Sequence, residues 1–481
     1  MAAERAIGPR RLVELLGGLH GAGPVYTRLA RGVEHLLLDG RVPPRSRVPS
    51  ERSLATALGV SRTTVAGAYA ELRARGYLES RRGSGSRTTL PSTPLDDEPA
   101  FLPSTDQRSI DLACATVPAL AGFTRAVEAA VTDLPRYTAQ HGYQPHGLPE
   151  LRQALADRYT ERGLATGPEQ VIVTSGALAA LDLALHHFTG PGDRVLCEHP
   201  TYPNALRSIE LAGARAVPTA VDPTGWDVAM VEATVRQANP RLAYLIPDFH
   251  NPTGHLMDDA TRQRLARALG SSGTPTVVDE TMVELSLDVD EDDMPRPFAA
   301  YARSSGAPVL LLGSAGKSFW GGLSIGWLRV PRSLVDPLLV TRAGLSTSTP
   351  VLDQLVLTHL MADRHAMLVP RRAELRAQRD HLAAALRRDL PDWEFHPPAG
   401  GLTLWCALPH PVTTALTALA ARQDVLLAPG PRFGIGASFE RFLRLPFTLP
   451  TDQIDDAVER IGWAYHAAAA GSSPQVETFV A

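Results

Sequence analysis

A single lysine, Lys317, stands in a chain of 481 residues in which lysine and arginine together number 47. Arginine supplies charge, salt bridges and phosphate contacts as well as lysine does, but its guanidinium stays protonated. Only lysine offers a primary amine that can lose its proton and condense with an aldehyde. Lys317 is therefore a candidate covalent anchor for an aldehyde. The alternative is chance, in which the last lysine of a lysine-poor chain is a solvated surface residue.

Three further side chains that could bind a pyridine ring or its substituents follow predicted strands. Asp279 ends an apolar run, where an unpaired carboxylate is unfavourable; a protonated pyridine nitrogen would pair with it and act as an electron sink. Asn251, in Asn-Pro-Thr-Gly, can donate a hydrogen bond to a phenolate oxygen. Tyr202, in Glu-His-Pro-Thr-Tyr-Pro, can stack on a pyridine ring, although a packing tyrosine in a proline turn explains the same motif.

A phosphate site is predicted from two serine-containing turns. Ser175, Gly176 and Ala177 follow a strand-like run and open a helix, whose free N–H groups and positive dipole end favour an anion. Ser314, three residues before Lys317, is within reach of the same group. Aldehyde, pyridine, phenolate and phosphate are the parts of pyridoxal 5'-phosphate (PLP). These features together predict a site for that cofactor.

The elements that must position these residues are short β-rich runs alternating with helical patterns. The runs are 171–174, 194–197, 242–246, 276–279 and 309–312. Such alternation predicts an α/β domain with a largely parallel sheet. Ligands bind at the carboxyl ends of the strands in such sheets, which is where the predicted cofactor residues stand.

The first 90 residues differ from the rest in charge. They carry 15 arginines and 7 acidic residues, a net charge of +8, whereas the whole chain carries -4. The remaining residues are therefore acidic. A basic N-terminal region on an acidic body indicates that contact with nucleic acid is confined to the N-terminus.

This basic region contains three predicted helices and a hairpin. The first helix spans 24–40, Ser50 caps the second, and Ser61 caps the third. The apolar stripe of the third helix is Val65, Tyr69 and Leu72. A hairpin with a glycine-rich basic tip follows over 76–87. The order predicts a winged helix-turn-helix; a small helical domain with solvated arginines is the alternative.

The third helix would enter the major groove of double-stranded DNA with its N-terminal residues nearest the bases. The predicted contacts at this helix start are Ser61, Arg62, Thr63 and Thr64. The arginines predicted to position the domain on phosphates are Arg45, Arg47, Arg52, Arg81 and Arg82.

Composition sets the predicted boundaries. Residues 20–88 form the DNA-binding domain, 89–108 a flexible linker rich in proline, serine, threonine and acids, 109–467 the α/β domain, and 468–481 a disordered tail.

The three scattered cysteines lack metal-site spacing and indicate reduced core residues. We find no signal peptide and no apolar run of about 18 residues, so we expect a cytoplasmic protein without a membrane span or a bound metal.

Residues 47–65 closely resemble the GntR-type DNA-binding domain, and the order and spacing of the cofactor motifs resemble fold-type I aminotransferases. The pairing of the two resembles the MocR subfamily of bacterial transcriptional regulators over about residues 24–465. This resemblance implies a PLP-bound homodimer that binds an operator, in which each winged helix packs on the partner's large domain.

The resemblance also implies roles for individual residues. Lys317 would form the Schiff base, Asp279 would pair with the pyridine nitrogen, Asn251 would bind the phenolate, and Tyr202 would stack on the ring. Arg444, in Phe-Leu-Arg-Leu-Pro-Phe, matches the arginine that binds the carboxylate of a substrate or effector. Tyr143 matches a tyrosine that reaches the partner's phosphate.

Two positions depart from the pattern of the aminotransferases. Ser324 stands seven residues after the lysine, where an arginine usually anchors the phosphate, and Thr281 stands two residues after the aspartate, where a tyrosine is usual. Loss of an arginine–phosphate pair weakens cofactor binding by about 1.5–3 kcal/mol. Both departures disfavour transaminase turnover.

The sequence thus predicts a PLP-dependent, DNA-binding transcriptional regulator that senses an amino compound or PLP itself, and not an enzyme. Two alternatives stay open. One is an active aminotransferase that carries a DNA-binding head. The other is a dimerisation domain that has lost PLP, which the retention of Lys317 opposes.

Overall fold

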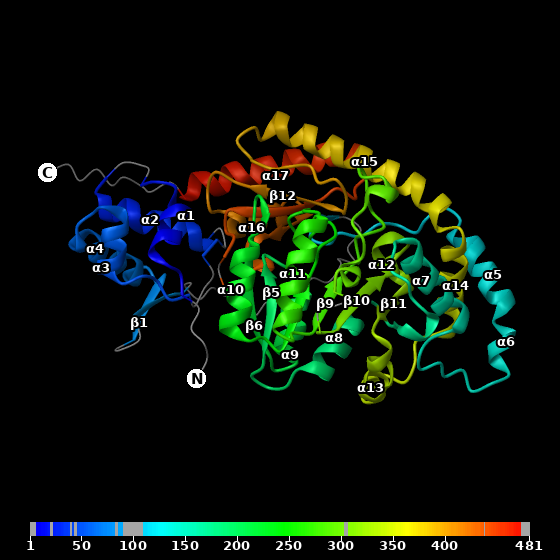
Figure 1. Cartoon of the computed structure of the whole chain (residues 1–481). Helices are drawn as coiled ribbons and strands as arrows, with labels where there is room; N and C mark the ends of the chain where they lie inside the picture. Colours follow the sequence, from blue (N-terminus) through cyan, green and yellow to red (C-terminus); the bar gives the residue numbers. More distant parts are fainter. Residues whose placement is uncertain are drawn as a thin grey trace.

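The computed structural model describes residues 6–19, 23–38, 41–42, 46–81, 85–89, 109–302, 306–436 and 438–472. They form an N-terminal head (residues 6–89), a large subdomain built on an eight-stranded sheet, and a small subdomain above it (Figure 1). Of the predicted linker only Thr89 is described, and residues 473–481 of the predicted tail lie outside the described residues.

The head contains the three predicted helices, α2 (Val25–Leu38), α3 (Glu51–Leu58) and α4 (Arg62–Ala74). The predicted caps are confirmed, because Ser50 accepts a hydrogen bond from the Ser53 amide and Ser61 accepts one from the Thr64 amide. Strands β1 (Leu78–Arg81) and β2 (Gly85–Thr88) pair antiparallel as the predicted wing.

An additional helix, α1 (Pro9–Leu16), precedes the predicted start of the domain at residue 20. Its Leu12 is fully buried in the same core as Val65, Tyr69 and Leu72 of α4. The predicted boundary was therefore too late, since the first turn of this helix supplies part of the apolar core of the head.

The central sheet has the order β4-β11-β10-β9-β8-β5-β6-β7. Its strands are β4 (Val171–Thr174), β5 (Arg194–His199), β6 (Arg215–Asp222), β7 (Gly225–Trp226), β8 (Leu242–Leu245), β9 (Thr276–Asp279), β10 (Val309–Ser314) and β11 (Gly326–Arg329). The five predicted strands are all present. Strands β11 and β7 run antiparallel to their neighbours. The five strands from β10 through β9, β8 and β5 to β6 run parallel to one another.

Helices cover both faces of this sheet (Figure 1). Along β10, Leu311 packs into one core and Leu310 and Leu312 pack into the other, so the strand is buried on both sides. The helices of the large subdomain are α5 (Phe123–Asp133), α6 (Pro135–Thr138), α7 (Pro149–Glu161), α8 (Ala177–Phe188), α9 (Pro203–Leu211), α10 (Val228–Ala238), α11 (Asp259–Ser271), α12 (Ala315–Ser318), α13 (Arg332–Ala343) and α14 (Val351–Ala362).

The small subdomain packs α15 (Arg364–Asp389), α16 (Thr413–Ala421) and α17 (Thr451–Ser472) on a sheet of β12 (Thr403–Ala407), β15 (Phe442–Pro446) and β14 (Ala428–Pro429). Strand β3 (Ile110–Asp111) pairs with β13 (Val425–Leu426), which brings the start of the α/β domain beside β15.

Helix α17 continues to Ser472, so the prediction of a disordered tail from residue 468 is wrong for its first five residues. The physical reason is packing, because Ala468 is buried in the core of the small subdomain. Among the described residues, no helix is long and apolar enough to cross a membrane.

Candidate cofactor site and DNA-binding surface

Lys317 lies on α12, immediately after β10 reaches the carboxyl edge of the sheet. Its Nζ donates a hydrogen bond to the carbonyl oxygen of Ala115 at 3.0 Å. Burial lowers the pKa of this amine and the charge of Arg444 lowers it further, whereas Cys114 and Asp279 act in the opposite direction. The solvated-surface alternative does not hold. A less basic amine is the form that attacks an aldehyde.

Asp279 ends β9, the strand beside β10. It is 8% exposed, and burial raises the pKa of its carboxyl group against the effect of hydrogen bonds from Thr281 and Tyr244. The Tyr244 hydroxyl donates to Oδ2 at 2.7 Å and the Thr281 amide donates to Oδ1 at 2.8 Å. These bonds fix the carboxylate, and each oxygen keeps a lone pair for a further donor.

Tyr202 lies at the start of α9 and is half-buried. Burial raises the pKa of its hydroxyl. The charge of Asp279 raises this pKa further, and the charge of Arg444 lowers it. The hydroxyl accepts a hydrogen bond from Asn204 at 3.0 Å. The structure therefore brings Lys317, Asp279, Tyr202 and Arg444 into one electrostatic cluster.

Arg444 lies on β15 of the small subdomain and is 4% exposed. Its guanidinium donates to the carbonyl oxygen of Ala113, and its Cζ lies 5.0 Å from the centre of the Phe433 ring. Burial lowers the pKa of Arg444 to about 10, so it stays protonated at neutral pH. A buried cation of this kind favours a carboxylate partner.

The segment from Ala113 to Ala115 was not singled out by the sequence analysis. The carbonyl oxygens at its two ends accept hydrogen bonds from Arg444 and Lys317, and Cys114 between them is buried and reduced. The segment therefore covers both cations. No local pattern marks it, because its role arises only when β3 pairs with β13.

The predicted phosphate turns lie side by side across three strands. Ser314 on β10 is paired with Gly326 on β11, which is paired with Thr174 on β4, directly before Ser175. A Cβ at Gly326 would lie 2.4 Å from the carbonyl carbon of Gly176, so only glycine fits there. The exposed Ser175 and the start of α8 at Ala177 thus stand at the same edge as Ser314, whose hydroxyl caps α12 by accepting from the Gly316 amide.

Asn251 lies in the turn after β8, and its Oδ1 is buried without a hydrogen-bond partner in the described part of the chain. Exchange of Oδ1 and Nδ2 by rotation of the amide would present a donor at that position instead. A buried amide oxygen without a partner suits a polar ligand such as PLP.

Two other positions singled out in the sequence are exposed. Ser324 is exposed, with a left-handed φ of 49°, at the turn before β11. Tyr143 is 59% exposed, and its ring stacks on His141 with centroids 5.8 Å apart. Among the described residues, no hydrogen bond or ring contact joins Tyr143 to the cofactor cluster.

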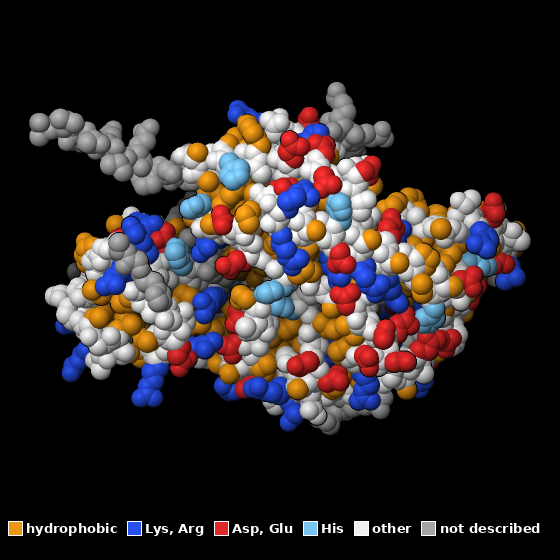
Figure 2. All heavy atoms as spheres, turned by 90° about the horizontal axis from the view of Figure 1, so that it is seen from above, with side chains coloured by type: hydrophobic (Ala, Val, Ile, Leu, Met, Phe, Trp, Pro, Cys, Tyr) orange, Lys and Arg blue, Asp and Glu red, His pale blue; other side chains and the backbone are white. Residues whose placement is uncertain are grey.

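The predicted DNA contacts at the start of α4 are largely exposed. Arg62 and Thr63 are exposed at the start of α4, and Ser61 and the half-buried Thr64 share a hydrogen bond at 2.8 Å. Arg62 Nε lies 3.4 Å from a carboxylate oxygen of Glu51. In the space-filling view, basic side chains project from the edge of the head, while both signs of charge alternate over the larger part (Figure 2).

Among the arginines predicted for phosphate contact, Arg47 and Arg52 are exposed. Arg81 lies on β1 of the wing. Arg45 and Arg82 lie outside the described residues.

Comparison with known proteins gives two family matches. The model of bacterial regulatory proteins of the gntR family matches residues 25–87, and the model of class I and II aminotransferases matches residues 116–461. The chain is 31% identical to the probable rhizopine catabolism regulatory protein MocR of Rhizobium meliloti, over 77% of this chain and 78% of that protein. The chain belongs to the MocR-type transcriptional regulators.

Further relatives of this MocR-type regulator support the same two-domain composition. It is 28% identical to the uncharacterized HTH-type transcriptional regulator YdcR of Escherichia coli, over 87% of this chain and 94% of that one. The crystal structure of LysN, an alpha-aminoadipate aminotransferase of Thermus thermophilus complexed with N-(5'-phosphopyridoxyl)-L-leucine, superposes with a TM-score of 0.68. That match is 28% identical and covers 76% of this chain and 94% of LysN. The winged helix and the fold-type I aminotransferase domain are confirmed, and PLP is supported as the cofactor.

Proposed function

We propose that this regulator senses an amino compound, or PLP itself, through its aminotransferase-like domain and converts that binding into a change in DNA affinity. The observation that carries the proposal is the Lys317 amine, which donates to the Ala115 carbonyl oxygen, follows the strand beside Asp279, and is made less basic by burial and the charge of Arg444. An amine-reactive anchor beside a carboxylate-binding cation suits a ligand that carries both an amino and a carboxylate group.

Each residue of the cluster has a distinct part in holding the cofactor and its ligand. PLP, when bound, supplies an aldehyde and an electron-accepting ring. Lys317 would anchor the aldehyde carbon, Asp279 would pair with the ring nitrogen, and Tyr202 would stack on the ring. The phosphate is held by Ser314 and the turn of Ser175, Gly176 and Ala177 at the start of α8.

The remaining predicted residues complete this arrangement. Asn251 would bind the phenolate oxygen, and Arg444 would orient the carboxylate of the effector. Because Tyr143 is exposed, it is free to reach the phosphate site of a second copy in a homodimer. We place the protein in the cytoplasm, where its DNA target lies.

Turnover is not part of the proposed function. Ser324 is too short to reach a phosphate as an arginine would, and it is exposed to solvent. Thr281 supplies its backbone amide to Asp279 and has no phenol to offer the cofactor. An active aminotransferase with a DNA-binding head is the second candidate, supported by the retained Lys317–Asp279–Arg444 cluster. Sustained production of a keto acid from an amino acid would favour it.

The proposed function is tested by measuring affinity for an operator, which is first isolated by selection from random duplex DNA. Fluorescence anisotropy is recorded for the protein alone, with PLP, and with PLP plus a panel of amino acids and amines. We expect PLP or one of these additions to change the dissociation constant at least about fivefold, as coupled sites do. Equal affinity under all conditions would refute sensing.

Substitution of Arg62 by alanine is expected to weaken operator binding about five- to 150-fold, because a base contact contributes roughly 1–3 kcal/mol. Arg62 is 74% exposed at its side chain, so the head should keep its fold. Anisotropy titration of both proteins on the selected operator measures the effect.

The matched control is Arg207→Ala on α9. Arg207 is also exposed and also forms an ion pair on the surface, with Glu210. Surface pairs of this kind contribute little to stability. If the Arg62 and Arg207 variants bind the operator equally, the assignment of α4 as the DNA-reading helix is wrong.

A further inference from the structure

A cavity of about 130 Å³ lies between the large and small subdomains. The large subdomain lines it with the end of β6 and the turn after β8, and the small subdomain lines it with β12, the start of β15 and the loop after α15. A single water needs only about 10–15 Å³ of such space, and pockets for larger ligands begin at roughly 300 Å³. The cavity therefore suits a small ligand.

Aromatic rings of the small subdomain form one corner of this cavity. Trp405 and Phe442 are stacked, with centroids 5.1 Å and planes 8° apart. Phe439 lies 6.0 Å from each of them, at interplanar angles of 70° and 77°. A fourth lining ring, Phe395, has Arg387 Cζ 5.3 Å from its centre, so this wall already attracts one cation. The electron-rich face of an aromatic ring favours a cation in the cavity as well.

The backbone holds Phe439 at this corner in a strained conformation. Its φ is 66°, in the left-handed region that residues other than glycine rarely adopt. Two glycines make room for it, because a Cβ at Gly434 would lie 2.7 Å from the Phe439 ring and a Cβ at Gly430 would lie 2.0 Å from its carbonyl oxygen. Strain of this kind persists only where the surroundings enforce it, and it is concentrated at ligand sites.

The charged side chains that line the cavity are acidic. Asp222 ends β6, and Glu394 lies on the opposite, small-subdomain wall. Asp222 Oδ1 accepts from the amide and the hydroxyl of Thr224 at 2.8 and 2.6 Å. Within the described part of the chain, Asp222 Oδ2 and the Glu394 carboxylate have no hydrogen-bond or ion-pair partner, and no arginine or lysine lines the cavity. Burial lowers the pKa of the lining His255, which keeps it uncharged at neutral pH.

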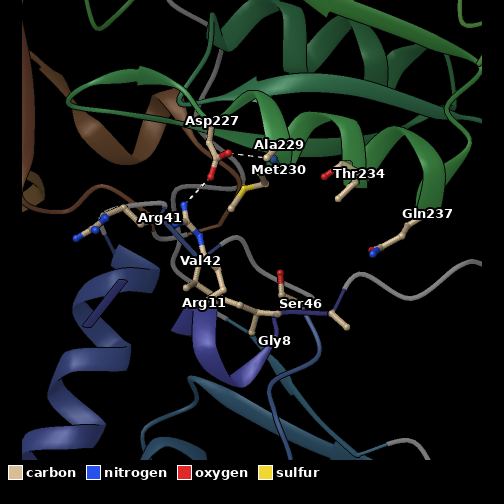
Figure 3. A pocket seen from close by; sticks show the side chains of 13 residues that line it. Gly8, Arg11, Arg41, Val42, Ser46, Asp227, Ala229, Met230, Thr234 and Gln237 are labelled. Carbon is tan, nitrogen blue, oxygen red and sulfur yellow. Dashed lines mark hydrogen bonds and ion pairs between the residues drawn. The ribbon is translucent and has the colours of Figure 1, made fainter. Parts of the chain in front are cut away.

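Another cavity, of about 320 Å³, lies where the head meets α10 and has a different chemistry (Figure 3). Arg11 and Arg41 lie on its wall, and Arg11 Nη2 is 2.5 Å from Asp227 Oδ2. The acid of that cavity is thus already paired with a cation of the chain. In the cavity between the subdomains, a cationic ligand would take this part.

We propose that the cavity between the subdomains binds a quaternary ammonium group. The aromatic rings offer no acceptor for the N–H groups of a primary ammonium, which would lose hydrogen bonds to water on entering. A quaternary ammonium has no N–H group, and aromatic faces with nearby carboxylates suit its charge. It forms no imine with PLP, and neither Lys317 nor Arg444 lines the cavity. The site is therefore separate from the cofactor cluster and does not rest on the proposed function.

The test is isothermal titration calorimetry of the full-length protein, incubated with PLP, with choline as the probe. The control ligand is the uncharged carbon analogue of choline, in which a tert-butyl group replaces the trimethylammonium group. We expect choline to bind with a dissociation constant below about 1 mM. The analogue should bind at least about tenfold more weakly, because it has the shape of choline but no charge for the rings and carboxylates.

Two substitutions locate the bound probe. Asp222→Asn removes a charge but keeps Oδ1 as the acceptor for Thr224, and Trp405→Leu removes a ring. The matched controls are Asp258→Asn, because Asp258 also accepts from a backbone amide, and Trp463→Leu, because Trp463 is exposed on α17; neither residue lines the cavity. We expect the first two variants to weaken choline binding at least about fivefold and the controls to stay within about twofold.

Equal binding of choline and its uncharged analogue would show an apolar cavity and overturn the proposal, as would the absence of choline binding at millimolar concentrations. Equal losses in the cavity variants and the controls, or no loss in either cavity variant, would place choline elsewhere and overturn it too. Asp222→Asn decides the matter even if Trp405→Leu does not fold, because the turn at Thr224 is kept. DNA affinity is not measured here, so this proposal and the proposed function fail separately.

Discussion

Replacement of Lys317 by alanine is expected to abolish the visible absorption band that appears when PLP is added to the protein. The band requires an imine between the cofactor aldehyde and a lysine amine, and the chain contains no other lysine. The Lys317 amine donates a hydrogen bond to Ala115, and burial and Arg444 lower its pKa, which favours the neutral form that reacts with an aldehyde. Absorbance spectra recorded during titration with PLP measure the effect directly.

Lys317→Arg is the matched control for charge, because arginine restores the cation beside Asp279 but forms no imine with the cofactor. It should behave as the alanine variant does in the visible spectrum. After borohydride reduction, mass spectrometry of the unmodified protein should find the cofactor on the peptide that contains Lys317. A persistent band in both variants would show that a different amine binds PLP and would contradict the assignment.

The parts of the site that could be predicted from the sequence are those set by local pattern. The apolar run ending at Asp279 and the run before Ser314 each form a strand, and their carboxyl ends place the two residues at one edge of the sheet. The serine caps of α3 and α4 were also predictable, because a cap depends on the residues directly after it.

What could not be predicted depends on contacts between distant segments. Tyr244 holds Asp279 only because β8 lies beside β9, and Ala115 meets Lys317 across 202 positions of the chain. Strand β11 is short and follows a glycine-rich turn, so nothing in its sequence shows that it runs antiparallel between β10 and β4. Such contacts follow from the topology of the sheet and not from spacing along the chain.

Substitution of Asp279 by asparagine is expected to raise the dissociation constant for PLP about tenfold to 150-fold. The carboxylate would lose its charged hydrogen bond to the pyridine nitrogen, and such a bond contributes roughly 1.5–3 kcal/mol. Asparagine nearly matches the shape of aspartate; its Oδ1 can still accept from the Thr281 amide, and its Nδ2 can donate to the Tyr244 hydroxyl oxygen, so the strand should be preserved. Titration of the visible band with PLP gives the dissociation constant.

The same variant should also change the pH dependence of PLP capture. The charge of Asp279 raises the pKa of Lys317, so its removal lowers that pKa further. The amine then becomes neutral at lower pH, and the midpoint of the capture rate against pH should move downward from that of the unmodified protein, which itself lies below the ordinary lysine value of 10.5. Tyr244→Phe, which removes one hydrogen bond but keeps the carboxylate charge, serves as the control. If Asp279→Asn weakens PLP binding no more than Tyr244→Phe and leaves the midpoint unmoved, Asp279 is a structural residue of β9 and not the partner of the cofactor ring.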